Sequence, residues 1–484
     1  MIILTEKQEE NVNNIKSFLE SEKEEFFTLE GVGGSGKTSS VVFAVKDIKD
    51  KLIIGGTISH AAKFVLNEGL KEAKIPCYTI AQLLELTQVI DEETGKISFK
   101  PATNVNYNSI SPLLNADIII IDECSMLSSE LHDSINKKKK RGAKVIYLGD
   151  PFQLCPIEED NKDSITFDFT KGKLHEAIRY TGPIADLGTR IRSEINKFNE
   201  GGSCSPFVIN EWQTSELGNS CRTSQVNKDG SGYIFVNDLD VIMDIASKSF
   251  KNSEDPNCMR LIAFRNATIK KLNDYIRTLI YEEDEENLEQ FMPGELVICD
   301  GGYAVKNLKA TDHSGKRMKA SRPCIHNNQV FKIKRIQKVD NGPEDIPSIM
   351  PILEPSVDLQ SGERIFALDN EKGLSLYQEK LKYLAEAARS NGRQWLNYYS
   401  FKENFAVFNY NYSCSVHKSQ GSTFLDAIVF EKDILSVSKI DTKVKLQSLY
   451  VACTRAKRRV YIYNSKYQVD NTGLPPELRE ELGL

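Results

Sequence analysis

The sequence predicts an α/β fold with two parallel-sheet domains, and three observations support this prediction. Short apolar runs alternate with helix-length segments through the first 175 residues, and similar runs return in the second half of the chain. A glycine-rich stretch, "GVGGSGKTSS" (31–40), directly follows the first of these runs. Apolar runs separated by helix-length segments are typical of strands buried on both faces, so each set predicts a parallel sheet covered by helices.

The predicted strands define the domain organisation. We expect a first domain over 1–174, a second over 175–300 and 409–484, and a third domain, 301–408, inserted into the second. A smaller β-hairpin insertion is expected at about 85–112, where Thr94-Gly95 separates two short extended arms, although a plain surface hairpin explains the same pattern. The inserted domain combines β-rich basic pieces with an amphipathic helix. The expected strands are 26–29, 52–56, 116–121 and 144–149 in the first domain, and 260–264, 426–430 and 458–463 in the second.

The composition indicates a soluble enzyme of two to four domains, because 484 residues exceed what one hydrophobic core holds. Hydrophobic residues make up 40% of the chain and charged residues 27%, as in an ordinary globular protein. No run approaches the roughly 18 apolar residues of a membrane span, and the N-terminus becomes charged too early for a signal peptide. Ten cysteines without a C-x-x-C pair predict free thiols in a reducing cytoplasm. The compact size of the chain would suit the cytoplasm of a bacterium or a phage-infected cell.

The charge is unevenly distributed. A net charge of −6 argues against a protein that coats nucleic acid with its whole surface, but a local basic channel remains compatible with it. Between Tyr303 and Lys338 there are ten Lys or Arg residues and a single acid, Asp312. This segment fits either a binder of a narrow polyanion or an ordinary solvated surface.

The glycine-rich stretch fits the phosphate-loop pattern G-x-x-x-x-G-K-[ST] between a strand and a helix. Its backbone N–H groups and the following helix N-terminus would surround the phosphates of ATP. Lys37 would reach the β- and γ-phosphates, and Thr38 would bind Mg²⁺. The predicted nucleotide-binding residues are Gly31, Val32, Gly33, Gly34, Ser35, Gly36, Lys37, Thr38 and Ser39.

A second acidic element completes the predicted site. The run "IIIIDE" ends in two carboxylates, where Asp122 would hold Mg²⁺ and Glu123 would polarise the attacking water. A hydrophobic run ending in Asp-Glu says little alone, but with the phosphate loop on the same sheet it predicts hydrolysis of ATP.

Several further motifs resemble those of superfamily 1 helicases. They are "LTEKQ" (4–8), "DECSM" (122–126), "GDPFQLCPI" (149–157), "HKSQGST" (417–423) and "LYVACTRAKRRVYI" (449–462). The last two are similar to the versions in the 5′→3′ branch, superfamily 1B, which contains the RecD-like enzymes. The resemblance implies two RecA-like domains, and an inserted domain of SH3-like and helical character in the second.

The resemblance also implies roles for single residues at the nucleotide. Gln8 would bind adenine, Gln153 would sense the γ-phosphate, and Gln420 and Gly421 would lie at the nucleotide. Arg179 and Arg455 would both reach the γ-phosphate across a cleft between domains. An arginine delivered in this way stabilises transition-state charge and is worth about 10³–10⁵ in kcat.

The implied DNA path is less regular. Two segments resemble the family's DNA-contact motifs, "TISHAAKFVL" (57–66) and "YTIAQLL" (78–84). The first departs from the family at Ile58, which replaces a proline, and the second at Ala81, which replaces a histidine. These departures put individual contacts in doubt, but not the path. The implied DNA-binding residues are Thr57, Ser59, His60, Thr79, Phe99, Trp395, His417, Lys418, Ser422 and Thr423, with Phe99 as a wedge and Trp395 as a stacking or core residue.

The sequence thus predicts a monomeric ATP- and Mg²⁺-dependent helicase that moves 5′→3′ on single-stranded DNA and opens forked duplexes. Single-strand-binding and replication proteins are candidate partners, and no membrane is involved. Two alternatives stay open. One is a RecD-like motor subunit of a recombination complex, and the other is a P-loop ATPase that binds single strands without unwinding.

Overall fold

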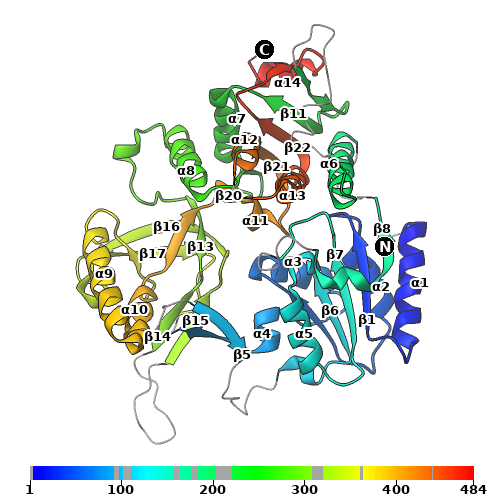
Figure 1. Cartoon of the computed structure of the whole chain (residues 1–484). Coiled ribbons are helices and arrows are strands. Elements are labelled where there is room, and N and C mark those ends of the chain that lie inside the picture. The colour runs from blue at the N-terminus through cyan, green and yellow to red at the C-terminus, as the bar shows by residue number, and fades with distance from the viewer. Residues whose placement is uncertain are drawn as a thin grey trace, which may run out of the picture. The chain divides into compact units, whose positions relative to one another are not determined.

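The computed structural model describes residues 4–91, 97–101, 111–156, 163–176, 182–202, 221–307, 320–359, 363–438 and 440–483 (Figure 1). The chain forms two compact units. The first comprises Met1–Glu85, Val105–Ile280 and Tyr412–Leu484, and the second comprises Leu86–Asn104 and Tyr281–Asn411. In the described part of the chain, no helix is both long enough and apolar enough to cross a bilayer.

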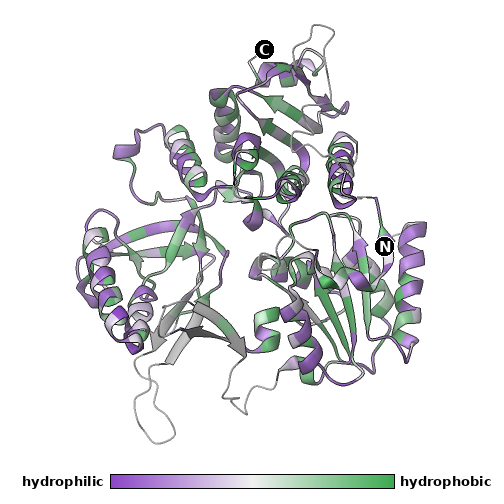
Figure 2. Cartoon of the chain, in the orientation of Figure 1, coloured by the Kyte–Doolittle hydropathy of each residue, from purple (hydrophilic) through white to green (hydrophobic). Residues whose placement is uncertain are grey.

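The first unit contains two lobes, and lobe 1 is built on a parallel six-stranded sheet of order β3-β2-β6-β7-β1-β8. Four of its strands lie within two residues of the predicted apolar runs. The strands are β1 Phe26–Gly31, β2 Ile53–Thr57, β3 Cys77–Thr79, β6 Ile118–Asp122, β7 Lys144–Gly149 and β8 Thr170–Leu174. Figure 2 shows hydrophobic residues gathered on the strands, as expected of a sheet covered on both faces.

Helices pack against this sheet and close the core of lobe 1. Each of the longer ones begins at a side-chain or glycine cap; Thr5, for example, forms a capping box with Gln8. The core combines strand residues such as Leu29 and Ile120 with helix residues such as Ile15 and Leu66. The helices are α1 Glu6–Glu20, α2 Lys37–Val45, α3 His60–Leu70, α4 Ile80–Leu84 and α5 Ser129–Lys138, with 3₁₀ turns at Pro112–Leu114, Cys124–Met126 and Ile165–Phe169.

Lobe 2 is built on a second six-stranded sheet of order β10-β11-β22-β21-β12-β20. All of its neighbouring strands are parallel except the short β10, which pairs antiparallel with β11. The predicted strands at 260–264, 426–430 and 458–463 are β12, β21 and β22. The bounds are β10 Gln225–Val226, β11 Gly232–Val236, β12 Met259–Ala263, β20 Ser413–Ser415, β21 Phe424–Phe430 and β22 Ala456–Tyr463.

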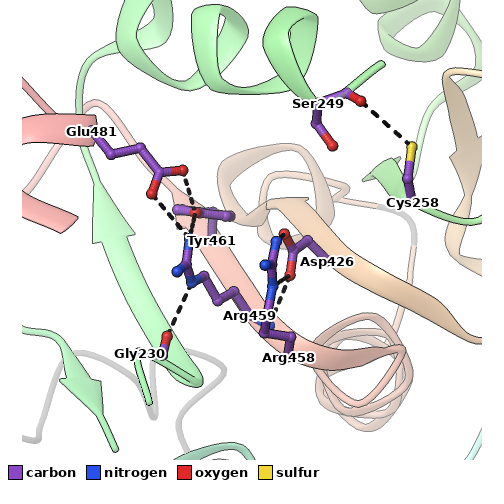
Figure 3. A network of polar contacts seen from close by, with 8 residues as sticks. All are labelled: Gly230, Ser249, Cys258, Asp426, Arg458, Arg459, Tyr461 and Glu481. Atoms are coloured by element: carbon purple, nitrogen blue, oxygen red, sulfur yellow. Dashed lines mark hydrogen bonds and ion pairs between the residues drawn. The ribbon is translucent and has the colours of Figure 1, made fainter. Parts of the chain in front are cut away.

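The helices of lobe 2 are α6 Pro183–Asn199, α7 Leu239–Lys251, α8 Asn266–Tyr281, α11 Val416–Ser419, α12 Glu431–Leu435, α13 Thr442–Cys453 and α14 Pro476–Glu481, and a separate parallel pair joins β9 Cys221–Thr223 to β23 Gln468–Asp470. Polar contacts fix the last helix to the sheet (Figure 3). Arg459 on β22 donates to Glu481 on α14 (2.9 Å) and to the Gly230 carbonyl (3.0 Å). The predicted class, an α/β chain with two RecA-like parallel-sheet domains, is confirmed.

The second unit contains the inserted segments. Its antiparallel hairpin, β4 Leu86–Ile90 with β5 Ile97–Pro101, corresponds to the predicted insertion, and the Thr94-Gly95 turn signal lies outside the described residues. A five-stranded sheet and two helices lie largely within the segment expected to be inserted, 301–408. The sheet extends beyond that segment, because it includes Leu296–Asp300 and ends at Tyr410. The remaining elements are β13 Leu296–Asp300, β14 Tyr303–Asn307, β15 Ala320–Ile325, β16 Val330–Val339, β17 Ser348–Glu354, β18 Ala367–Leu368, β19 Val407–Tyr410, α9 Leu374–Ser390, α10 Trp395–Lys402 and short turns at Glu285–Asn287, Pro343–Asp345 and Gly392–Gln394.

Candidate nucleotide-binding site and nucleic-acid interface

The phosphate loop lies between β1 and α2, and its geometry requires glycine. A Cβ added to Gly31 would lie 2.7 Å from the Leu174 carbonyl oxygen, so any larger residue would collide with the neighbouring backbone. Gly36 caps α2 with φ 84°, a left-handed conformation that favours glycine. At these two positions the loop therefore carries no side chain that would keep a phosphate away from its backbone N–H groups.

Lys37 and Thr38 begin α2 and face the loop and the neighbouring strand end. The Lys37 Nζ donates to the Gly31 and Val32 carbonyls at 2.7 and 3.1 Å, which places the ammonium group across the loop. The Thr38 Oγ1 lies 3.5 Å from Asp122 Oδ2 at the end of β6. A hydroxyl and a carboxylate placed side by side at a phosphate loop are the oxygen donors that Mg²⁺ takes together with phosphates. The residues present therefore fit a bound ATP·Mg²⁺.

Glu123 follows Asp122 in an unusual backbone conformation. Its φ and ψ are 54° and 42°, in the left-handed region, which turns the chain sharply after the strand. Burial, and then the charge of neighbouring Asp122, raise the pKa of the Glu123 carboxyl above its usual range. A carboxylate with a raised pKa is a stronger base, so this position suits a group that accepts a proton from water.

Gln8 supports the phosphate loop in this structure. Its Oε1 accepts from the Thr5 backbone N–H at 3.0 Å, and its Nε2 donates to the Ser35 carbonyl at 3.1 Å. The side chain is buried, so both ends of the amide are engaged by backbone. The adenine contact remains a prediction, and the observed role is to connect α1 to the loop.

Arg455 reaches the phosphate loop from lobe 2. It follows α13, is only 3% exposed, and its Nη2 lies 3.6 Å from the position of a Cβ added to Gly33. The Nε donates to the Val451 carbonyl (2.9 Å) and Nη1 to the Ser422 carbonyl (3.3 Å), which fixes the guanidinium. The second predicted arginine, Arg179, lies outside the described residues.

Sequence reasoning missed how the loop after β7 engages lobe 2. The Tyr450 hydroxyl on α13 donates to Asp150 Oδ2 at 2.6 Å, and the Phe152 ring lies edge-on to Tyr450. Leu154 belongs to the hydrophobic core of lobe 2, although it follows a strand of lobe 1. The sequence gives little signal for these contacts, because Tyr450 and its partner Asp150 are 300 positions apart. The tyrosine within "LYVACTRA" is the local feature that could have indicated them.

Four of the predicted DNA-binding residues lie at the carboxyl ends of the neighbouring strands β2 and β3. Thr57 ends β2 and is buried, while Ser59 caps α3 and accepts from Ala62 N at 3.1 Å. Thr79 caps α4, where its Oγ1 accepts from Gln82 N at 3.2 Å, and His60 is the first residue of α3. Two helix N-termini thus open at one edge of the sheet, a position that favours phosphate groups.

The segment after β20 carries the other predicted contacts of the first unit. His417 is partly buried with its ring edge-on to Phe264, and burial lowers the pKa of the imidazole. A neutral imidazole can donate a hydrogen bond but attracts phosphate less than the exposed Lys418 does. Ser422 and Thr423 follow in the turn before β21, where Ser422 N donates to the Ser419 carbonyl at 3.0 Å.

The two predicted contacts in the second unit differ in exposure. Phe99 on β5 is 63% exposed, which leaves its ring free to meet a ligand. Trp395 is 9% exposed and packs against Tyr398 and Tyr399. Its burial favours the core role over stacking on a base.

Two parallel-sheet lobes that meet at a phosphate loop are the architecture of RecA-like motor ATPases, and this chain has that architecture. Comparisons with known proteins agree. Residues 4–180 match the AAA domain family, and residues 410–463 match the UvrD-like helicase C-terminal domain. These matches support the resemblance to superfamily 1B helicases that the sequence motifs indicate.

Individual relatives cover almost the whole chain. An uncharacterized protein of Acanthamoeba polyphaga mimivirus is 26% identical over 94% of this chain and 98% of its own length. The ATP-dependent DNA helicase dda of Enterobacteria phage T4 is 24% identical over 95% of this chain and 98% of its own. Among solved structures, the Bacteroides Pif1 helicase in complex with ADP-AlF3 and ssDNA shares 16% identity over 99% of this chain and 97% of that one, with a TM-score of 0.46.

Proposed function

We propose that this protein is an ATP-dependent DNA helicase that moves 5′→3′ along single-stranded DNA and opens duplexes. The observation that carries the proposal is the position of Arg455 beside Gly33, because it brings a lobe 2 cation to the phosphate loop of lobe 1. A cation that can bind the γ-phosphate only while the lobes are together couples hydrolysis to lobe movement. In this proposal residues 1–174 form the first motor domain, 175–300 with 409–484 the second, and 301–408 the inserted domain.

In this proposal the residues of the site have separate roles in the hydrolysis of ATP. Thr38 and Asp122 would hold Mg²⁺, which when bound neutralises charge on the β- and γ-phosphates. Lys37 would leave the loop carbonyls for the phosphates, and Glu123 would orient the attacking water and accept its proton. Gln153 and Arg455 would bind the γ-phosphate, Arg455 from the other lobe. Loss of the γ-phosphate then removes the partner that keeps the lobes together.

The track for DNA would follow the edge where β2 and β3 end and continue onto the segment after β20. The helix N-termini at Ser59 and Thr79 favour phosphate oxygens, and Lys418 adds an exposed positive charge. These groups contact backbone rather than bases, so they suit movement along any sequence.

The hairpin is proposed to separate the strands, and a single substitution tests it. We expect Phe99→Ala to reduce unwinding several-fold while DNA-stimulated ATPase is retained, because the exposed ring would stack at the fork at about 1–3 kcal/mol per base. The rates of both activities are measured on the same forked substrate. Leu396→Ala, which shortens another exposed apolar residue of the same unit, serves as the matched control. Equal loss of both activities in Phe99→Ala would contradict the wedge.

Unwinding of forked duplexes that carry either a 5′ or a 3′ single-stranded tail tests the function as a whole. We expect unwinding only with the 5′ tail, and we expect Lys37→Ala to abolish both ATP turnover and unwinding because the phosphates lose their cation. Turnover retained in Lys37→Ala would show that the nucleotide site is wrongly assigned.

The same experiment separates the alternatives. DNA-stimulated ATPase without unwinding would favour a RecD-like motor that needs a partner. ATPase that DNA does not stimulate would favour a P-loop ATPase without motor activity, and unwinding from the 3′ tail would reverse the proposed direction.

A further inference from the structure

The Gln153 amide is held by a residue from the other lobe. Gln153 is buried in the loop after β7, and its Oε1 accepts a hydrogen bond from Gln420 Nε2 at 3.0 Å. Gln420 directly follows α11 of lobe 2 and is itself only 7% exposed. The same Nε2 also donates to Ser125 Oγ at 3.3 Å, so the donor group of Gln420 faces lobe 1.

This contact fixes which end of Gln153 faces the phosphate loop. With its Oε1 turned to Gln420, the Gln153 Nε2 points the other way and lies 3.9 Å from the position of a Cβ added to Gly33. Arg455 Nη2 is next to the same point, at 3.6 Å. Two donors from different parts of the chain therefore meet at one place on the loop.

The orientation of the amide has chemical consequences because phosphate oxygens only accept hydrogen bonds. If the Gln153 amide were reversed, its carbonyl oxygen would face the γ-phosphate and repel it. Reversing Gln420 alone would place two carbonyl oxygens against each other, so the two amides must turn together. The arrangement in which Gln420 donates is the one that leaves a donor for the phosphate.

We propose that Gln420 is a positioning residue for ATP: it orients the Gln153 amide so that the site prefers ATP to ADP only while lobe 2 is in place. This inference rests on the proposed function for the identity of the nucleotide. It goes beyond that function in one respect. Gln420 of lobe 2, acting through Gln153, would help the site to distinguish nucleotides with a γ-phosphate from those without one.

Gln420→Glu tests the proposal, because glutamate has the shape of glutamine but its carboxylate cannot donate. The affinities of the full chain for ATPγS and ADP are measured without DNA. We expect the preference for ATPγS over ADP to fall about tenfold to a hundredfold, the value of one hydrogen bond to a charged group, with little change in ADP affinity. Gln420→Ala, which also lacks the donor but adds no charge, should lower the preference in the same direction.

Two controls make the result specific. Gln447→Glu is the same change at a second buried glutamine of lobe 2, one that accepts from Cys155 Sγ at 3.6 Å, and it should keep the preference for ATPγS. In a Gln153→Ala background, Gln420→Ala should add no further loss, because the amide that it orients is already gone.

Other outcomes would overturn the proposal. An unchanged preference in Gln420→Glu would do so, and so would a parallel loss of affinity for both nucleotides, which indicates a general loosening of the pocket. Since no DNA is present, failure of the helicase assignment would leave this measurement unaffected, so the two proposals fail separately.

Discussion

Arg455→Ala is expected to lower the kcat of ATP hydrolysis by about 10³–10⁵ while ATP still binds. The guanidinium is buried, is fixed by the Val451 and Ser422 carbonyls, and lies next to Gly33. Charge that develops on the γ-phosphate in the transition state would be met by a preorganised cation that needs no rearrangement. Single-turnover hydrolysis and nucleotide binding, measured separately, distinguish loss of chemistry from loss of affinity.

Two further variants sharpen this prediction. Arg455→Lys keeps the charge but not the planar fork of donors, so it should recover only part of the rate. Arg459→Ala removes an arginine four positions later that binds α14 rather than the phosphate loop, and it should leave kcat unchanged (Figure 3). A kcat for Arg455→Ala within a few-fold of the unchanged protein would remove the main support for a two-lobe motor.

The sequence predicts this fold well wherever structure follows from local patterns. Seven apolar runs are strands within two residues of their predicted bounds, because short apolar runs bounded by turn signals are typical of strands in the interior of a sheet. Strand β8, Thr170–Leu174, has no such run. It forms the edge of its sheet, where only Gly172 and Leu174 are buried, so its sequence carries little signal.

The candidate site was predictable only in part, for the same physical reason. The phosphate loop and its acidic pair are contiguous, and their spacing shows in the sequence. The contact of Gln153 with Gln420 joins residues 267 positions apart, and no local pattern reports it. Ser59 and Thr79 are predicted DNA contacts, yet their hydroxyls also cap helices, a role that the same residue types fill in any protein.

Glu431→Ala is expected to be strongly destabilising. Glu431 and Arg222 form a two-point ion pair at 2.7 and 3.2 Å with side chains 0% and 3% exposed. Asn464 Nδ2 donates to the same carboxylate at 2.7 Å, and the Arg222 guanidinium lies 3.8 Å from the centroid of the Tyr467 ring. Removing the carboxylate leaves a buried cation without its main counter-charge, which costs about 3–5 kcal/mol.

Urea unfolding of Glu431→Ala should therefore show a large loss, whereas Glu481→Ala should lose only about 0.2–1 kcal/mol. Glu481 pairs with Arg459 at a similar distance, 2.9 Å, but its side chain is 36% exposed, so water already solvates the carboxylate (Figure 3). The double variant Arg222→Met with Glu431→Leu should recover most of the stability, because two apolar side chains remove the desolvation cost together with the attraction. If the double variant were as unstable as Glu431→Ala, the loss would come from the packing around Tyr467 and not from an unpaired charge.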